Sequence, residues 1–232
     1  MLSKQDDSFP DPKQFDDQGL IAIGGDLSPP RLLKAYCSGI FPWYEPGQPI
    51  LWWSPNPRMI LLPDSFKRSR SLKKSLKKPF CFTVDSAFPA VIHACATTSD
   101  RTHRTWITPE MINAYIKLHE LGYAHSVEVW QDTKLVGGLY GLSLGGVFFG
   151  ESMFHKVRDT SKLAFSYLSQ LLKIWNFDFI DCQLPTHHLS SLGATIISRH
   201  DYLAWLNNSL KKPTRIGSWK NDAFDAFAKS SV

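Results

Sequence analysis

The sequence predicts an α+β protein with a small irregular N-terminal domain followed by a larger domain, whose mostly antiparallel central sheet is flanked by helices. Three observations carry this prediction: proline and glycine are dense before residue 62, three strand-like runs follow one another between residues 126 and 154, and amphipathic helical segments lie on either side of those runs. The 232 residues are 43% hydrophobic, which is enough for one good-sized core or two modest cores and excludes a chain that is disordered throughout.

The N-terminal domain is predicted to span residues 1–62. Repeated prolines and glycines exclude long regular elements there. One short helix fits, because Ser28 can cap it, Pro29 suits its first position and Gly39 ends it. The second domain then covers residues 63–232.

The second domain is predicted to begin with an apolar strand at 80–84 and a helix at 87–96. A better-marked helix follows, because Thr108 can cap it, Pro109 suits its first position and Gly122 ends it. These helices precede the main run of strands.

An antiparallel meander forms the centre of the predicted sheet. The strand-like runs cover residues 126–130, about 135–144 and 147–154, and turn signals of hairpin length separate them. Strands joined by such short turns run antiparallel, so we expect the three runs to be neighbours in one sheet.

A long amphipathic helix is predicted to start at 159–161, where Asp, Thr and Ser can cap it. The residues of its apolar stripe are Leu163, Tyr167, Leu168, Leu171 and Trp175. A strand at 177–183, a short helix near 188–192 and a last helix from about Asp201 complete the order. This order of elements is close to that of many N-acetyltransferases, and it predicts an acetyltransferase-like (GNAT-like) domain.

Basic residues are concentrated in one segment, residues 67–78, which contains no acid. We call it the basic segment, and its seven basic residues are Lys67, Arg68, Arg70, Lys73, Lys74, Lys77 and Lys78. Without it the chain has 19 basic residues against 21 acidic ones, so the net charge of +5 is a local property that indicates an anion or a nucleic-acid backbone as partner. A solvated helix with Leu72 and Leu76 turned inward explains the segment equally well.

Cysteine and histidine patterns argue against a metal site. Cys37, Cys81, Cys95 and Cys182 include no C-x-x-C pair, and no pair of histidines is spaced like zinc ligands. We therefore expect no metal, no disulfide framework and a reducing, cytoplasmic location. The first residues lack a signal-peptide pattern, and no run reaches the roughly 18 to 20 apolar residues that span a bilayer, so we expect no membrane partner.

Three polar residues interrupt apolar runs of the predicted sheet. Asp181 and Gln183 lie two apart on one strand, so we expect both side chains on the same face. Glu151 follows Gly150, which can mark a bulge that re-aims its neighbours. Because buried polar groups are costly unless paired, these residues indicate a polar site with apolar walls. A satisfied structural network is the alternative.

Several long and unusual blocks resemble the leucyl/phenylalanyl-tRNA–protein transferase family, and the similarity extends over most of the chain. The blocks are Gly24-Gly25-Asp26-Leu27-Ser28-Pro29, Gly39-Ile40-Phe41-Pro42-Trp43, Leu51-Trp52-Trp53-Ser54-Pro55 with Pro57-Arg58, Thr105-Trp106-Ile107-Thr108, His125-Ser126-Val127-Glu128-Val129-Trp130, Gly150-Glu151-Ser152-Met153-Phe154, and Ile180-Asp181-Cys182-Gln183 with Ser191-Leu192-Gly193-Ala194. Chance similarity at this length is negligible.

The resemblance implies an enzyme that moves leucine or phenylalanine, and less readily methionine, from aminoacyl-tRNA to the N-terminal Arg or Lys of an acceptor protein. The new N-terminus then acts as a degradation signal. In this family a small N-terminal domain packs on an acetyltransferase-like domain. Aminoacyl-tRNA is the co-substrate and no cofactor is implied, and we expect a monomer.

The resemblance also implies roles for individual residues. Asp181 and Gln183 occupy the catalytic positions, and Glu151 occupies a substrate-contact position. The residues expected at the terminal adenosine of the tRNA are Tyr36, Trp43, Trp106 and Tyr115. The residues expected around the amino-acid side chain are Leu139, Phe148, Met153, Phe165, Leu168, Leu172 and Ile180. The basic segment, which follows the domain junction, is expected to hold the backbone of the acceptor arm.

This sequence departs from the family pattern at a few positions. Asn56 stands where the family usually has Asp, and His155-Lys156 replaces the common Ser-Arg. Leu139 and Leu168 fill pocket positions where other members can carry Met or Phe, so the order of preference among Leu, Phe and Met stays open.

Two other functions compete with this reading. The order of elements alone also suits an acyl-CoA-dependent N-acyltransferase. The basic segment and the aromatic residues also suit a non-catalytic RNA-binding module. Only the first of these rivals is an enzyme.

Overall fold

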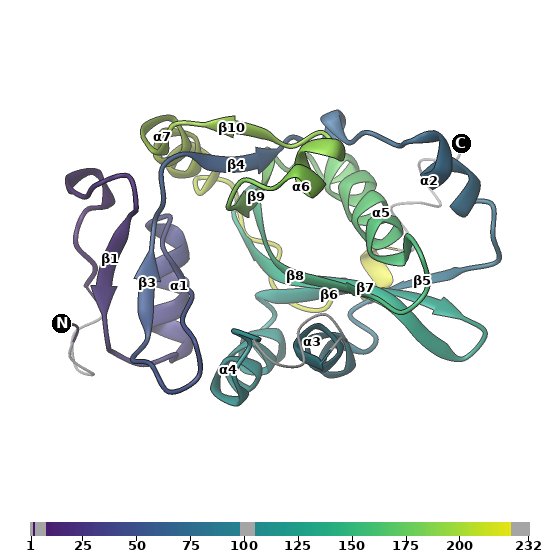
Figure 1. Cartoon of the computed structure of the whole chain (residues 1–232), viewed down its shortest axis with the longest axis horizontal. Helices are drawn as coiled ribbons and strands as arrows, with labels where there is room; N and C mark the ends of the chain where they lie inside the picture. The colour runs from purple at the N-terminus through teal and green to yellow at the C-terminus, as the bar shows by residue number, and fades with distance from the viewer. Residues whose placement is uncertain (1, 3–7, 98–104, 224–232) are drawn as a thin grey trace.

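The computed structural model describes residue 2, residues 8–97 and residues 105–223. The strands of this part of the chain form two separate sheets, one of three strands and one of seven. Figure 1 shows the small sheet and helix α1 at one end of the long axis, whereas the large sheet and its helices occupy the rest. We refer to these two parts as the N-terminal unit and the C-terminal unit.

The N-terminal unit is an antiparallel sheet, in the order β1-β3-β2, with one helix beside it. Its elements are the 3-10 helix η1 (Pro12–Gln14), β1 (Leu20–Ile23), α1 (Pro29–Cys37), β2 (Phe41–Pro42) and β3 (Leu51–Trp53). Helix α1 begins directly after Ser28 and ends before Gly39, so its predicted bounds are confirmed, but the Ser28 side chain makes no capping hydrogen bond. Gly39 has φ +73°, and a Cβ there would lie 2.8 Å from the Tyr202 ring, so only glycine fits this close approach.

The C-terminal unit contains the large sheet, in the order β10-β4-β9-β8-β7-β6-β5. Its strands are β4 (Arg58–Leu61), β5 (Cys81–Val84), β6 (Ala124–Gln131), β7 (Lys134–Leu144), β8 (Val147–His155), β9 (Phe179–Gln183) and β10 (Thr195–Ile197). The predicted meander is confirmed as β6, β7 and β8. Strands β8 and β9 run parallel, and the other neighbouring pairs run antiparallel, so the α+β class with a mostly antiparallel sheet is also confirmed.

Helices cover both faces of the meander. The helices of the C-terminal unit are η2 (Pro63–Ser65), α2 (Arg70–Ser75), α3 (Phe88–Thr97), α4 (Pro109–Glu120), α5 (Thr160–Ile174), α6 (His187–Ser191) and α7 (Arg199–Ser209). Of these, α3, α4 and α5 pack on the strands of the meander. Helices α3 and α4 lie on one face, and α5 crosses the other (Figure 1). The stripe predicted for α5 is explained by this contact, because Leu163, Leu168 and Leu171 are almost completely buried against β6 and β7.

Strand β4 belongs to the large sheet, because it pairs with β9 on one side and β10 on the other. The boundary expected between residues 62 and 63 therefore falls after a strand of the C-terminal unit. The expected boundary was based on the density of prolines. Proline density cannot predict that β4 pairs with strands more than a hundred residues further along the chain. We propose a boundary within residues 54–57, between β3 and β4.

Two helices differ in extent from the expectation. The basic segment was expected to be helical over its whole length, whereas α2 covers only Arg70–Ser75, after a cap in which Ser69 accepts a hydrogen bond from the Leu72 N–H. The last helix begins at Arg199, because Ser198 caps it, and not at Asp201. In both cases a serine cap sets the first turn.

The loop between the two units is held by Asn56 and Arg199. The Asn56 side-chain amide donates to Asp17 Oδ1 at 2.7 Å, and its oxygen accepts from the Arg199 N–H at 2.8 Å. The Arg199 guanidinium donates to the carbonyls of Phe15, Asp16 and Ser54, at 2.8 Å for Asp16 and 2.7 Å for Ser54. The departure from the family pattern at position 56 is thus matched to Asp17, because the amide of Asn, unlike the carboxylate of Asp, can donate to Asp17 while it accepts from Arg199.

We predict that Asn56→Asp destabilises this chain. The new carboxylate would lose the donor to Asp17 and would repel it, which should lower the free energy of unfolding by about 1 kcal/mol. Urea denaturation of both proteins measures the loss. The double variant with Asp17→Asn restores a donor and should recover most of it, and a loss that the second change does not reduce would contradict the explanation.

Candidate active site

The sheet opens between strands β8 and β9. The two strands pair only where Val147–Phe149 run beside Phe179–Asp181, and beyond these residues each strand pairs with its other neighbour alone. A bulge in each strand marks the separation. Tyr140 faces Ser152 and Gly141 faces Gly150, which leaves Glu151 as the extra residue of β8, so the predicted bulge is confirmed.

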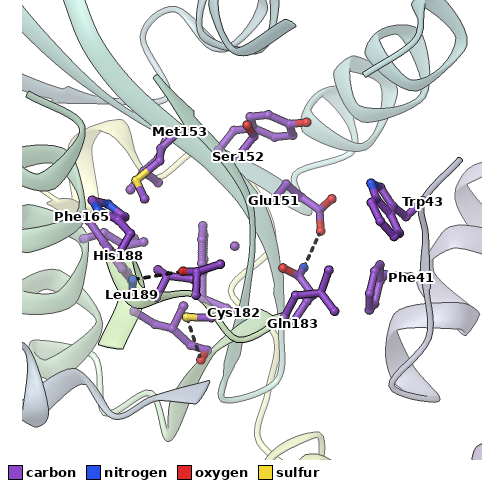
Figure 2. A pocket seen from close by; sticks show the side chains of 18 of the residues that line it. Phe41, Trp43, Glu151, Ser152, Met153, Phe165, Cys182, Gln183, His188 and Leu189 are labelled. Atoms are coloured by element: carbon purple, nitrogen blue, oxygen red, sulfur yellow. Dashed lines mark hydrogen bonds between the residues drawn. The ribbon is translucent and has the colours of Figure 1, made fainter. Parts of the chain in front are cut away.

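A cavity of about 400 Å³ lies at this opening, and Figure 2 shows it from close by. Its apolar end contains Met153, Phe165 and Leu189, whereas Phe41 and Trp43 of the N-terminal unit stand at the other end, beyond Glu151 and Gln183. Polar groups therefore stand between an apolar pocket and an aromatic entrance. This is the usual composition of a site that fixes the orientation of a small ligand.

Glu151 is the carboxylate that faces the cavity. Tyr36 donates from its hydroxyl to Oε1 at 2.7 Å, and Tyr115 donates to Oε2 at 3.0 Å. Gln183 donates from Nε2 to Oε1 at 3.2 Å, as the dashed line in Figure 2 shows. Burial raises the pKa of Glu151 to about 7, and the two tyrosine hydrogen bonds offset only part of this increase. The side chain can therefore gain or lose a proton near neutral pH.

Asp181 is fully buried and lies outside the cavity lining. The Arg58 guanidinium donates to it twice, from Nε at 2.9 Å and from Nη2 at 2.6 Å, and the Tyr202 hydroxyl donates at 2.8 Å. The backbone N–H of Gln183 donates to Oδ1 at 3.0 Å. Arg58 itself lies between the rings of Phe41 and Tyr202, at 4.9 and 4.3 Å from their centroids.

The expectation that Asp181 and Gln183 share one face of the strand is wrong. Met59 faces Gln183 and Ile60 faces Asp181, so Cys182 is an extra residue that interrupts the alternation. Gln183 also has φ +56°, which turns its side chain further from the regular strand direction. As a result Cys182 and Gln183 line the cavity, while Asp181 points to Arg58.

The aromatic residues divide into two kinds. Trp43 is 42% exposed, and both Trp43 and Trp106 line the cavity. Tyr36 and Tyr115 are almost fully buried, and their hydroxyl oxygens lie 2.5 Å apart behind Glu151. Their rings are buried and their hydroxyls hold the Glu151 carboxylate, so their expected contact with the terminal adenosine stays a prediction.

Six of the seven expected pocket residues line the cavity, and they are Leu139, Phe148, Met153, Phe165, Leu168 and Ile180. Leu172 does not, because it lies one turn further along α5 in the core. Lining residues that the sequence analysis missed are Phe41, Pro42, Tyr140, Gly150, Ser152, Cys182, Leu184, Thr186, His188 and Leu189. Phe41 and Pro42 precede Trp43 in one of the blocks that resemble the family, so their place in the cavity could have been predicted from that block. Nothing in the sequence of the short helix α6 indicated that His188 and Leu189 line the cavity.

The basic segment does not lie beside the domain junction in space. Figure 1 shows α2 next to α5, at the end of the molecule opposite the N-terminal unit. Arg68 donates from Nε to Ser166 of α5 at 2.9 Å, and Ser75 donates to Asp159 at 3.0 Å. These bonds place the segment beyond the apolar end of the cavity, so its nearness to the junction in sequence was misleading.

No metal or membrane feature stands out in the part of the chain that the structure describes. Those residues include no group of three or more His, Cys, Asp or Glu side chains arranged to hold a metal ion. Among the same residues, no helix combines the length and the apolar character needed to cross a bilayer. The four cysteines are free thiols.

The family models identify this α+β protein, whose large sheet opens over a lined cavity, as a transferase. The chain belongs to the leucyl/phenylalanyl-tRNA–protein transferase family. The model of that family matches residues 60–207, and the model of its N-terminal domain matches residues 25–56.

Relatives with the same family name are similar over nearly the whole chain. A leucyl/phenylalanyl-tRNA–protein transferase of Legionella pneumophila (strain Paris) is 62% identical, over 96% of this chain and 100% of its own length. One of Syntrophus aciditrophicus (strain SB) is 57% identical, over 91% of this chain and 89% of its own. A solved GCN5-related N-acetyltransferase from Kribbella flavida has a TM-score of 0.37 and 12% identity, over 73% of this chain and 61% of its own.

We predict that Asp181 and Gln183 differ sharply in their effect on stability. Asp181→Asn leaves Arg58 buried without a counter-charge, which should lower the free energy of unfolding by about 3 kcal/mol or more. Gln183→Asn removes one partly exposed hydrogen bond and keeps a residue type that tolerates positive φ, so the loss should stay near 1 kcal/mol. Urea denaturation measures both losses, and equal losses would contradict the greater contribution of the buried Arg58–Asp181 pair to stability.

We predict a pH-dependent stabilisation by Glu151→Gln. The pKa of Glu151 is higher in the folded protein than its ordinary value of 4.5, so the folded state holds the extra proton and wild-type stability falls as the pH rises from about 4.5 to about 7. The difference in Tm, variant minus wild type, should be more positive at pH 8 than at pH 5. Glu120→Gln, on the exposed face of α4, is the control, and a pH-independent difference for position 151 would refute the prediction.

Proposed function

We propose that the protein transfers leucine or phenylalanine, and less readily methionine, from aminoacyl-tRNA to the N-terminal Arg or Lys of acceptor proteins, which creates an N-terminal degradation signal. The observation that carries the proposal is the cavity, in which Glu151 and Gln183 separate an apolar pocket from an aromatic entrance. Family membership supports the same reaction.

The apolar pocket would select the amino acid. Leu139, Met153 and Phe165 offer aliphatic, thioether and aromatic surface to an unbranched or γ-branched side chain. A charged side chain would be stranded there without a partner. The flexible side chain of Met153 can adapt to leucine, phenylalanine or methionine, which suits a pocket that accepts all three.

The aromatic entrance would hold the terminal adenosine. Trp43 and Trp106 line it, and stacking of a base on such a ring contributes roughly 1 to 3 kcal/mol. Trp43 is supported from behind, because its ring meets that of Trp53 edge to face at 6.0 Å between centroids. The adenosine at this end would leave the ester beside Glu151.

The reaction requires little activation, because the aminoacyl ester is already reactive. The amine nitrogen of the acceptor bonds to the ester carbonyl carbon, the bond to the ribose oxygen breaks, and one proton passes from the amine to that oxygen. Gln183 directs its Nε2 to Glu151, so its Oε1 is free to accept a hydrogen bond from the amine. Glu151, with a pKa near the working pH, can take part in the proton transfer.

Asp181 would then act as a positioning residue. It accepts a hydrogen bond from the Gln183 backbone and is paired with Arg58, so it holds the turn that presents Gln183. A carboxylate that accepts a hydrogen bond from the Gln183 side-chain amide would polarise that amide, and Asp181 is the carboxylate that the resemblance puts in a catalytic position. The geometry supports Glu151 in that role instead, because Glu151 is the carboxylate bonded to this amide.

The proposal also covers the contact with tRNA, the oligomeric state and the location of the enzyme. The basic segment would contact phosphates of the tRNA acceptor arm, read by charge and shape. No cofactor takes part in the proposed reaction, and the proposed enzyme is monomeric and cytoplasmic.

The test is a transfer assay with leucyl-tRNA, phenylalanyl-tRNA and acetyl-CoA as donors and an Arg-initiated peptide as acceptor. We expect aminoacylated peptide from both tRNAs and no acetylated peptide. Gln183→Ala should lower kcat/KM about 10²-fold, whereas Lys117→Gln, on the exposed face of α4, should leave it unchanged. Acetyl-peptide alone would favour the acyl-CoA alternative, and tRNA binding without any transfer would favour the RNA-binding module.

A further inference from the structure

A second cavity, of about 450 Å³, adjoins the active-site cavity, and Met153 and His188 line both. Its own wall contains Arg158, Lys162 and His155. It therefore lies beyond the apolar end of the active site, on the side that faces α2. None of the roles assigned above uses it.

Positive charge dominates this second cavity. Asp159 is the one carboxylate in its lining, and that charge is already engaged: Ser75 donates to it at 3.0 Å, and Lys162 and Arg158 lie 3.6 and 3.9 Å away. The Arg158 side chain is 87% exposed, so most of its five N–H donors face solvent. Burial, and then the charges of Lys162 and His155, lower the pKa of His188, which agrees with a positive local potential.

The backbone adds to this potential. Helix α5 has 15 residues, and its first turn, with Ser161 and Lys162, lies in the cavity wall. Asp159 at the N-cap has φ +69° and makes no side-chain capping bond to the helix. The positive end of the helix dipole therefore reinforces the two cationic side chains.

The cavity is continuous with the basic segment. Ser71 of α2 lines it, and Arg68 is tied to α5 through Ser166. Cations thus extend from the apolar end of the active-site cavity to α2. An anion of single charge would need only one of these groups, whereas a chain of phosphates would use the series.

We propose that this second cavity binds a backbone phosphate of the single-stranded 3′ end of the tRNA donor, with Arg158 and Lys162 as its ligands. The proposal rests on the proposed function, because it takes aminoacyl-tRNA as the donor. It adds a phosphate site between the active site and the basic segment, so the RNA strand would run from the adenosine at the aromatic entrance along the outside of the active-site cavity to α2. An acidic side chain of the acceptor protein is the competing ligand.

The experiment compares two donors of different length. Phenylalanyl-tRNA carries the phosphates, whereas phenylalanyl-adenosine carries none. For Arg158→Gln combined with Lys162→Gln, we expect the KM for phenylalanyl-tRNA to rise about tenfold or more, and the slope of log(kcat/KM) against log salt to become shallower by about 0.7 for each lost phosphate contact. Transfer from phenylalanyl-adenosine should change less than about twofold.

The matched control is Lys117→Gln combined with Lys211→Gln, which removes two exposed charges elsewhere and should leave both donors unaffected. An unchanged KM for phenylalanyl-tRNA overturns the proposal. An equal loss with both donors also overturns it, because it would place the two residues in the aminoacyl site or in folding. A loss that appears only with acceptor peptides carrying an acid after the N-terminal Arg overturns it in favour of the acceptor.

Direct binding separates this proposal from the proposed function. Binding of tRNA that carries no amino acid can be measured for wild type and the double variant without any transfer reaction. We expect the variant to bind this tRNA about tenfold more weakly. If wild type transfers nothing from either donor, the proposed function is wrong, and equal binding by the two proteins would then overturn the phosphate site as well. If wild type is active and the variant matches it in both assays, only the phosphate site is wrong.

Discussion

The buried ion pair between Arg58 and Asp181 is the interaction on which the site depends. It joins β4 to β9 from within the sheet, and Phe41 of the N-terminal unit covers the guanidinium. A pair of this kind is costly to break, because removing one partner would leave the other as a buried charge with neither a counter-charge nor water around it. The pair therefore ties together two strands and the contact between the two units, and the turn at Gln183 follows from it, since Asp181 also binds the Gln183 N–H.

This pairing separates the roles of two carboxylates that lie close together. Asp181 accepts hydrogen bonds from Arg58, Tyr202 and the Gln183 backbone, and it does not line the cavity. Glu151 has only neutral partners and is buried behind them, so its pKa rises to about 7. One carboxylate is thus structural, and the other is able to exchange a proton near neutral pH.

Local patterns in the sequence predicted the features that depend on local physics. The meander follows from strand-like runs and short turns, the start of α1 from Ser28 and Pro29, and the bulge at Glu151 from a glycine beside a carboxylate in an apolar run. The opposite directions of Asp181 and Gln183 were not predictable in this way. A single extra residue, Cys182, reverses every later side chain of a strand, and nothing in the sequence of β9 marks it.

The sequence by itself determined the class of fold, the family, and the set of polar and aromatic residues that form the site, because composition, periodicity and long shared blocks are properties of the chain. The tertiary structure decided which residues face the cavity and where the charge lies. In the structure Tyr36 and Tyr115 donate hydrogen bonds to Glu151, and the basic segment lies at the end of the molecule opposite the N-terminal unit. The physical reason is that strand pairing and burial bring together residues far apart in the chain, and a one-residue bulge is enough to change which of them meet.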